Sequence, residues 1–190
     1  DEDSGGKKFH AIGDPTEGAL VVAAAKFGLM KDDLDEHKPR VSEVAFDSDR
    51  KRMTTLHSLA KSEQSAIREL LNVVAPKAAY ISFTKGAVDG LLDVSTHVWE
   101  NGTRHPLTAD YRQRIEAANR SLAENGMRVL GVAFKTYDRP ENGTALESAL
   151  TIVGFVGIMD PPRPEVKDAV AHAKSAGIRP VMITGDHPLT

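Results

Sequence analysis

The sequence has 190 residues, of which 41% are hydrophobic and 27% charged, with a net charge of −3 and no cysteine. This is the composition of a globular chain that can bury a core, and it provides no general attraction to nucleic acid or to anionic lipid. Disulfides and thiol chemistry are excluded, the seven histidines show no metal-ligand spacing, and no apolar run reaches the roughly 18 residues of a membrane span.

The first predicted element is a helix over 14–28. Asp14 suits the N-cap, Glu17 completes a capping-box spacing, and Gly28 suits the C-terminal stop. The residues before it, DEDSGGKK, are polar and predict a flexible segment over 1–8. The elements expected next are strands over 41–46 and 53–59, a short helix over 62–72, a strand over 78–84, a short helix over 86–94, a hairpin around Asn101-Gly102, an amphipathic helix over 108–126 and a strand over 127–137.

The pattern changes after residue 150. The run 151–160 is almost continuously apolar, as in a strand covered on both faces, and a helix over 164–177 and an apolar strand over 178–186 follow. A strand, a helix and a strand in this order predict a parallel βαβ unit, which cannot build a core alone and should dock on the rest. The predicted class is therefore α/β, with a mixed body over 9–150 and a parallel-sheet piece over 151–190. Since the chain stops soon after this last strand, we expect a portion of a longer protein.

Two motifs at the expected strand ends have alternative explanations. TGD at 184–186 offers a hydroxyl, an amide and a carboxylate that could hold a phosphoryl oxygen near magnesium, or it is an ordinary turn in which Asp186 caps a helix. DPPRPE at 160–165 is a second candidate site near it, or only a stiff proline loop.

Three motifs in the first half also have an ordinary structural explanation on local grounds. DPTE at 14–17 is explained in full by helix capping. FDSDRKRM at 46–53 is a charged hairpin tip, or an aromatic face for a base with cations beyond it for phosphates. Lys85, in FTKGA, is a solvated strand end or a charge held over a ligand. The sequence has no GxxxxGK[ST] and no GxGxxG, so a nucleotide would not be held by a Walker loop or a dinucleotide fingerprint.

The order and spacing of the motifs are more specific than any one of them. GDPTEGAL, FDSDRKRM, FTKGAVDGLLD, GMRVLGVAF, VGIMDPPRPEV and MITGDHPLT occur in this sequence along the chain. Together they strongly resemble the large cytoplasmic loop of P-type cation-transporting ATPases, most closely the bacterial calcium-pump-like branch. The resemblance covers nearly the whole chain, with a nucleotide-binding domain over about 9–150 and the start of the phosphorylation domain over 151–190.

The resemblance implies a fold and an activity. The nucleotide-binding domain should be a twisted antiparallel sheet flanked by helices, followed by a fragment of a haloacid-dehalogenase-like parallel sheet. It should bind ATP with Mg²⁺ and present the γ-phosphate to an aspartate outside this chain. Its partners would be the phosphorylation, actuator and transmembrane domains of the same polypeptide, with no nucleic acid. The domain would be cytoplasmic, not itself membrane-inserted, in a protein of a bacterial plasma membrane.

The family's nucleotide contacts carry over onto matching positions. For the base, the resemblance implies stacking on Phe46, a wall from Lys85, close backbone approach at Gly86 and Ala87, and a polar contact from Glu17. Asp14 and Thr16 are expected to support the rim of the pocket, and Met53 and Leu130 to line it. Lys51 and Arg128 are expected to face the phosphates. The positions expected to meet the terminal phosphate and its magnesium in the intact pump are Asp160, Arg163, Thr184, Gly185 and Asp186.

Some positions depart from the family pattern. Ser48 stands where calcium pumps often have arginine, and Arg50 or Arg52 could replace that phosphate contact. Val88-Asp89 replaces the usual Pro-Glu, and His187 replaces asparagine. The acceptor motif DKTGT and the magnesium motif GDGxND are absent from the 190 residues, so we expect this chain to bind ATP without turning it over. The alternatives are a non-catalytic nucleotide-binding or interaction module and a fragment of a haloacid-dehalogenase-like phosphatase.

Overall fold

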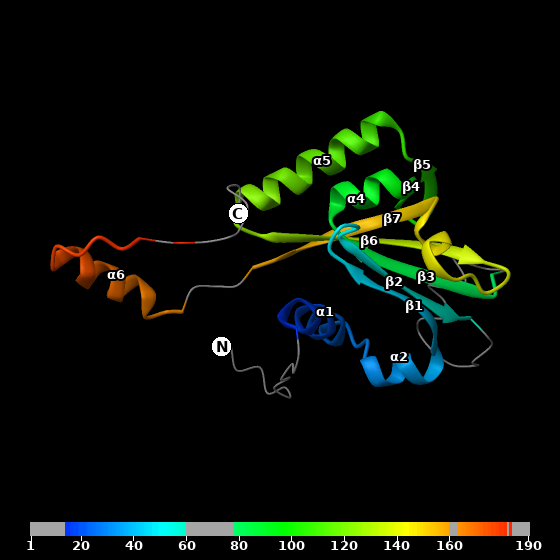
Figure 1. The fold of residues 1–190 in the computed structure, drawn as a ribbon, viewed down its shortest axis with the longest axis horizontal. Coiled ribbons are helices and arrows are strands. Elements are labelled where there is room, and N and C mark those ends of the chain that lie inside the picture. The colour runs from blue at the N-terminus through cyan, green and yellow to red at the C-terminus, as the bar shows by residue number, and fades with distance from the viewer. Residues whose placement is uncertain (1–13, 60–77, 160–162, 182, 184–190) are drawn as a thin grey trace.

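A computed structural model of the chain describes residues 14–59, 78–159, 163–181 and 183 (Figure 1). The predicted segment 1–8 and the predicted helix over 62–72 lie outside these residues. So do Asp160, Thr184, Gly185 and Asp186, and the expectations made for them stay predictions.

A seven-stranded sheet forms the body of the structure, in the order β1-β2-β3-β6-β7-β4-β5. All neighbouring strands are antiparallel except β4 and β7, which are parallel. This confirms the expected mainly antiparallel sheet, with one parallel pair. The strands are β1 (Arg40–Asp47), β2 (Arg52–Ser58), β3 (Tyr80–Gly86), β4 (Ser95–Glu100), β5 (Thr103–Pro106), β6 (Arg128–Tyr137) and β7 (Leu150–Ile158).

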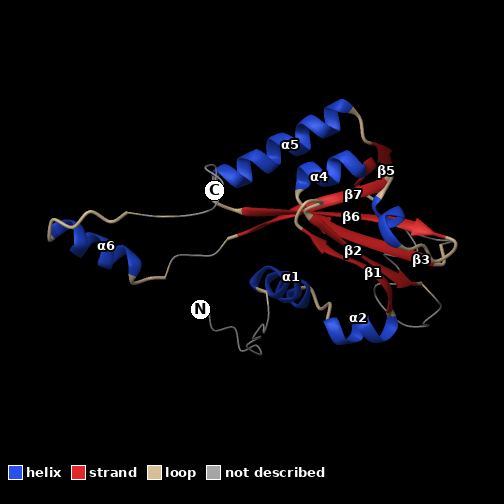
Figure 2. Ribbon diagram, viewed as in Figure 1, coloured by secondary structure: helices blue, strands red, loops and turns tan. Residues whose placement is uncertain are grey.

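Helices cover both faces of the sheet (Figure 2). On one face, α4 (Val88–Val94) and α5 (Ala109–Glu124) pack over a buried cluster that includes Leu91, Leu92 and Ile152. The short 3-10 helix η1 (Gly143–Glu147) covers the same face nearer β2, where Leu56 and Leu146 are fully buried. On the opposite face lie α1 (Pro15–Lys26) and α2 (Lys31–His37).

Local sequence signals set several of these elements. The Asp14 carboxylate accepts hydrogen bonds from the backbone N–H groups of Thr16, at 2.8 Å, and Glu17, at 3.3 Å, so it caps α1 as predicted. Thr108 likewise accepts from the N–H of Tyr111 at the start of α5. The β4–β5 hairpin turns at Asn101 and Gly102, whose φ angles of 51° and 76° are those that Asn-Gly turns adopt.

The parallel βαβ unit expected from residue 151 onward is not shown by the described residues. β7 is hydrogen-bonded to β6 along one edge and to β4 along the other. The pairing with β4 covers Leu150, Thr151 and Ile152, and residues 178–181 and 183 form no strand, so the second strand of the predicted unit is not seen within the described residues. The expectation of a strand covered on both faces is wrong, since Val153 is 47% exposed. The predicted helix that follows is present as α6 (Val166–Ser175), apart from the sheet (Figure 1).

Candidate functional site

A largely apolar cavity of about 560 Å³ lies between α1, α2 and the open face of the sheet. Of the predicted site residues that the structure describes, two line this cavity, Glu17 and Lys85. Its apolar lining includes Leu20, Val21, Phe83, Trp99 and Phe134. A cavity of this size, with a few polar groups beside an apolar floor, has the character of a small-molecule site.

An ion pair between Glu17 and Lys85 joins α1 to the sheet. The Lys85 ammonium contacts Oε2 of Glu17, and the two side chains are 23% and 53% exposed respectively. Glu17 is in the first turn of α1, whose orientation depends on the cap at Asp14. Backbone hydrogen bonds from Glu17 and Thr16 hold the pKa of the Asp14 carboxyl below its usual value, and the charge of Lys85 lowers it further. Of the two alternatives left open for Lys85, a solvated strand end does not describe it, because it is a paired cation at the cavity wall.

Phe46 lies in an irregular part of β1 at the same end of the sheet. The strand pairs Val44 with Thr54 and Asp47 with Arg52, so Ala45 and Phe46 together stand opposite the single residue Met53. Phe46 is 64% exposed, which leaves one ring face available for contact with another molecule. Its exposure fits the predicted stacking role and argues against a role in the core.

Met53, Lys85 and Val132 occupy one row across β2, β3 and β6. Strand alternation places Leu130 and Arg128 on the same face as Val132, further along β6. Leu130 is half-buried and Arg128 is exposed. The sheet thus brings Met53 and Leu130 near Lys85. In the described part of the chain, however, the apolar cavity is not lined by five of the predicted site residues, which are Phe46, Lys51, Met53, Arg128 and Leu130.

Gly86 and Ala87 make a close approach to the β1–β2 turn. A Cβ on Gly86 would lie 2.5 Å from the carbonyl oxygen of Lys51 and 2.5 Å from Cβ of Arg52. The N–H of Ala87 donates to that same carbonyl at 3.0 Å. In this structure the missing side chain of Gly86 makes room for protein backbone, where the sequence predicted room for a ligand. The contact also fixes Lys51, which is exposed and has a φ of 51°.

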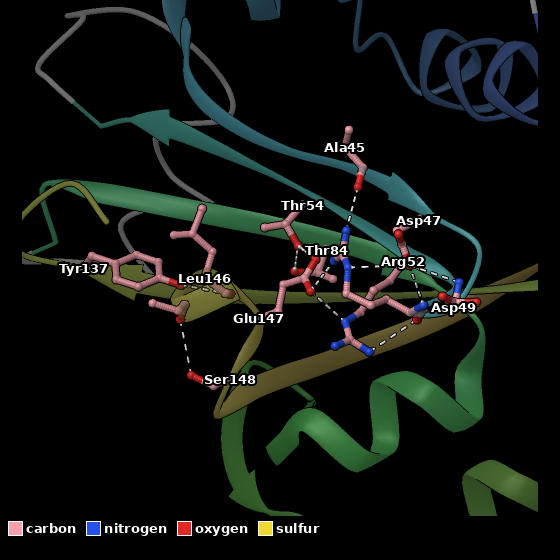
Figure 3. Close-up of polar contacts among 12 residues, drawn as sticks. Ala45, Asp47, Asp49, Arg52, Thr54, Thr84, Tyr137, Leu146, Glu147 and Ser148 are labelled. Carbon is pink, nitrogen blue, oxygen red and sulfur yellow. Dashed lines mark hydrogen bonds and ion pairs between the residues drawn. The ribbon is translucent and has the colours of Figure 1, made fainter. Parts of the chain in front are cut away.

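Glu147 is a site component that the sequence analysis missed. Its side chain is 1% exposed, and it forms ion pairs with Arg50 at 2.5 Å and Arg52 at 2.9 Å (Figure 3). The suggestion that Arg50 or Arg52 replaces a phosphate contact is therefore not supported, because both guanidinium groups are engaged with this carboxylate. The hydrogen bond from Arg50 to Glu147 raises the pKa of the guanidinium. The sequence signal at this place was the run of three cations, which does not by itself show where an acidic partner lies.

Arg163 is the one described residue of the predicted phosphorylation-domain set. It is exposed, and its carbonyl accepts a hydrogen bond from the N–H of Val166 at the start of α6. Within the described residues, no group of three or more His, Asp or Glu side chains could hold a metal ion. The same residues contain no helix with the length and hydropathy needed to cross a membrane.

Comparisons with known proteins decide the family. A family profile described as P-type ATPase, cytoplasmic domain N, matches residues 1–165. The chain belongs to the P-type ATPases. It is 45% identical over 177 residues to calcium-transporting ATPase 1 of Bacillus cereus and 36% identical over 177 residues to a calcium-transporting ATPase of Bacillus subtilis, with 92% of this chain covered in both. A sodium/potassium-exporting P-type ATPase of Schizosaccharomyces pombe is 37% identical over 183 residues, which cover 94% of this chain.

The matched region is a small part of each of these P-type ATPases. It makes up 18% of the two Bacillus proteins and 16% of the Schizosaccharomyces pombe protein. The profile that describes the cytoplasmic domain N extends past residue 158, so the whole of β7 falls inside it. This agrees with the position of β7 between β6 and β4 in the sheet.

Proposed function

We propose that this chain is the ATP-binding domain of a P-type cation pump. It would hold ATP at the end of the sheet that carries Phe46, Met53 and Lys85, and it would present the γ-phosphate to an acceptor aspartate elsewhere in the full-length protein. The observation that carries the proposal is the Glu17–Lys85 ion pair, at the end of the sheet where β1 carries the exposed Phe46, in a chain of this family.

Each of these side chains has a distinct part in binding the base. An exposed ring can stack on adenine, and the Lys85 stem can pack against the other side of the base. Lys85 engages Oε2 of Glu17, so Oε1 can accept a hydrogen bond from the exocyclic amine. A base held by stacking and few polar contacts leaves the triphosphate accessible to a second domain, as transfer between domains requires.

The phosphates would extend toward the cations at the rim. Lys51 and Arg128 are exposed at this end of the sheet and are the residues we expect to face them. Mg²⁺ would arrive with the triphosphate and neutralise part of its charge. The carboxylates that match the family's magnesium region, Asp160 and Asp186, lie outside the described residues.

The boundary toward the phosphorylation domain is best placed after β7. Because β7 is a central strand of the sheet, we propose that the nucleotide-binding domain runs to about residue 158 and that the phosphorylation domain begins after it, rather than at 151. In the intact pump, Asp160 and Arg163 would then stand at the junction of the two domains. The transported ion would be Ca²⁺ or a related cation, and the domain would face the cytoplasm of a bacterial plasma membrane.

Titration of ATP into isotope-labelled protein tests the function. We expect amide shifts at Phe46, Lys85 and Arg128 and a Kd in the micromolar to millimolar range, about −4 to −8 kcal/mol, because contacts from the partner domain are missing. We expect no ATP turnover by this chain alone, since the acceptor motif is not in it. If millimolar ATP produced no shifts at these residues, the proposal would be wrong and a non-catalytic interaction module would be favoured.

A further inference from the structure

Glu147 joins the β1–β2 turn to strand β2 through a single carboxylate. Oε2 accepts hydrogen bonds from Arg50 at 2.5 Å and from Arg52 at 2.9 Å, and Oε1 accepts from the hydroxyl of Thr54 at 3.1 Å. The Thr54 hydroxyl lies 2.9 Å from that of Thr84 on β3 (Figure 3). A carboxylate that is almost fully buried is stable only when it is paired in this way.

The same network reaches the backbone next to Phe46. Arg50 donates to Glu147 with one guanidinium nitrogen and to the carbonyl of Ala45 with another, at 2.8 Å. Ala45 and Phe46 are the two extra residues of the β1 irregularity. Arg50 therefore fixes the peptide that precedes the exposed ring, and it does so from a position set by Glu147.

The turn that presents Lys51 also has hydrogen bonds of its own. The Asp47 carboxylate accepts from the N–H groups of Asp49 at 3.0 Å and Arg50 at 2.9 Å, and Arg52 donates to the carbonyl of Arg50 at 3.3 Å. Lys51 thus stands between two arginines whose side chains are directed to Glu147. Repulsion among three consecutive cations would otherwise favour an open turn, and the buried carboxylate offsets it.

We propose that Glu147 is a positioning residue for nucleotide binding. It does not touch the ligand. By holding Arg50 and Arg52 it keeps the β1–β2 turn in the one arrangement that presents Phe46 and Lys51 on the ligand side. This inference rests on the proposed ATP-binding function, and it adds a residue on the opposite face of the sheet to the determinants of affinity.

Two variants and a control test the proposal in the 190-residue chain. Glu147→Gln keeps the shape and removes the charge. Arg50→Lys keeps the charge and the Glu147–Arg52 bond, but one ammonium cannot span both Glu147 and the Ala45 carbonyl. Glu100→Gln is the control, because Glu100, at the end of β4, also accepts from an arginine and a hydroxyl, those of Arg114 and Tyr111 in α5.

The readouts are the Kd for ATP and the amide exchange of residues 45–52 without ligand, both at a temperature at which circular dichroism shows each variant folded. If the turn keeps its competent form about a tenth of the time, the Kd rises about tenfold. We expect this rise, with faster exchange, in Arg50→Lys and Glu147→Gln, and neither change in Glu100→Gln. If Glu147→Gln does not fold, Arg50→Lys still decides the question.

The two proposals fail in different ways. If the wild-type chain does not bind ATP, the proposed function is wrong and the positioning role falls with it. If the wild-type chain binds ATP and folded Arg50→Lys binds it equally well with unchanged exchange, Glu147 is only a stabilising residue. An equal loss of affinity in Glu100→Gln would likewise show a general effect of stability rather than positioning.

Discussion

The carboxylate of Glu17 in the first turn of α1 pairs with the ammonium of Lys85 in β3, across 68 residues of sequence. The pair lies at one wall of the cavity beneath α1, and Lys85 stands in the row formed with Met53 and Val132. More than half of Glu17 is exposed, so the pair contributes little to the stability of the fold, as is usual for pairs open to water. We therefore attribute its importance to ligand binding.

Replacement of Lys85 should affect binding and not folding. We expect Lys85→Met to keep the packing stem, to leave the melting temperature nearly unchanged and to weaken ATP binding about tenfold, the effect of one lost charged contact. Lys135→Met is a suitable control, because the Lys135 ammonium lies over the ring of Tyr137, 5.0 Å from its centroid, on the other face of the sheet. Equal Kd values for the two variants by titration calorimetry would rule out a ligand contact at Lys85.

Replacement of Phe46 should remove the stacking contact with the base. Since the ring is mostly exposed, Phe46→Ala should retain the fold, while ATP binding weakens by about 1–3 kcal/mol, the usual contribution of a base stacked on an aromatic ring.

Phe83→Ala shows which part of the face receives the base. Phe83 lines the apolar cavity and makes an edge contact with His57, with ring centroids 5.9 Å apart. Chemical-shift titrations with ATP should show a larger loss of affinity in Phe46→Ala than in Phe83→Ala. A larger loss for Phe83→Ala would place the base inside the cavity, and unfolding of Phe46→Ala would assign its ring to the core.

Two glycines near the site should respond in opposite directions to alanine. In Gly86→Ala the new methyl group would meet the Lys51 carbonyl at 2.5 Å, and backbone cannot easily move away, so we expect a loss of about 1–3 kcal/mol in the free energy of unfolding. In Gly90→Ala the atom nearest to the new methyl group is the Arg50 carbonyl oxygen, at 3.8 Å, so there is room for it. Because Gly90 is in a helix, the free energy of unfolding should rise by up to about 1 kcal/mol. Urea denaturation measures both, and a neutral Gly86→Ala would show that the turn can move aside.

The cap of α1 should titrate at acid pH. Hydrogen bonds from Glu17 and Thr16 hold the pKa of Asp14 below the value of about 3.9 that an unfolded aspartate has. The cap therefore stabilises the folded state above about pH 3.9, and this contribution is lost as the pH falls through the lower folded pKa. The amide shifts of Thr16 and Glu17 should show a midpoint below about pH 3.9.

Two variants of Asp14 serve as controls for this titration. Asp14→Asn keeps a capping oxygen without a titrating proton, so its amide shifts should stay flat over the same range. Asp14→Ala should weaken α1 at every pH. A wild-type midpoint at or above the unfolded value would mean that the cap is not formed in solution.

The sequence determined the elements whose signals are local. Asp14 predicted the start of α1, the amphipathic pattern over 108–126 predicted α5, and Asn101-Gly102 predicted the β4–β5 turn, because caps, helical patterns and turns depend on residues within a few positions of each other. The motif order also identified the family correctly, as the profile over residues 1–165 shows.

The tertiary structure decided which distant residues are partners. The apolar run of β7 fitted a separate parallel unit equally well, and only its hydrogen bonds to β6 and β4 assigned it to this sheet. Gly86 lies close to the Lys51 backbone, and Arg50 and Arg52, either of which could have replaced a phosphate contact, both pair with Glu147. Strand pairing and burial of a charge depend on what the rest of the chain brings near, and the local pattern does not contain that information.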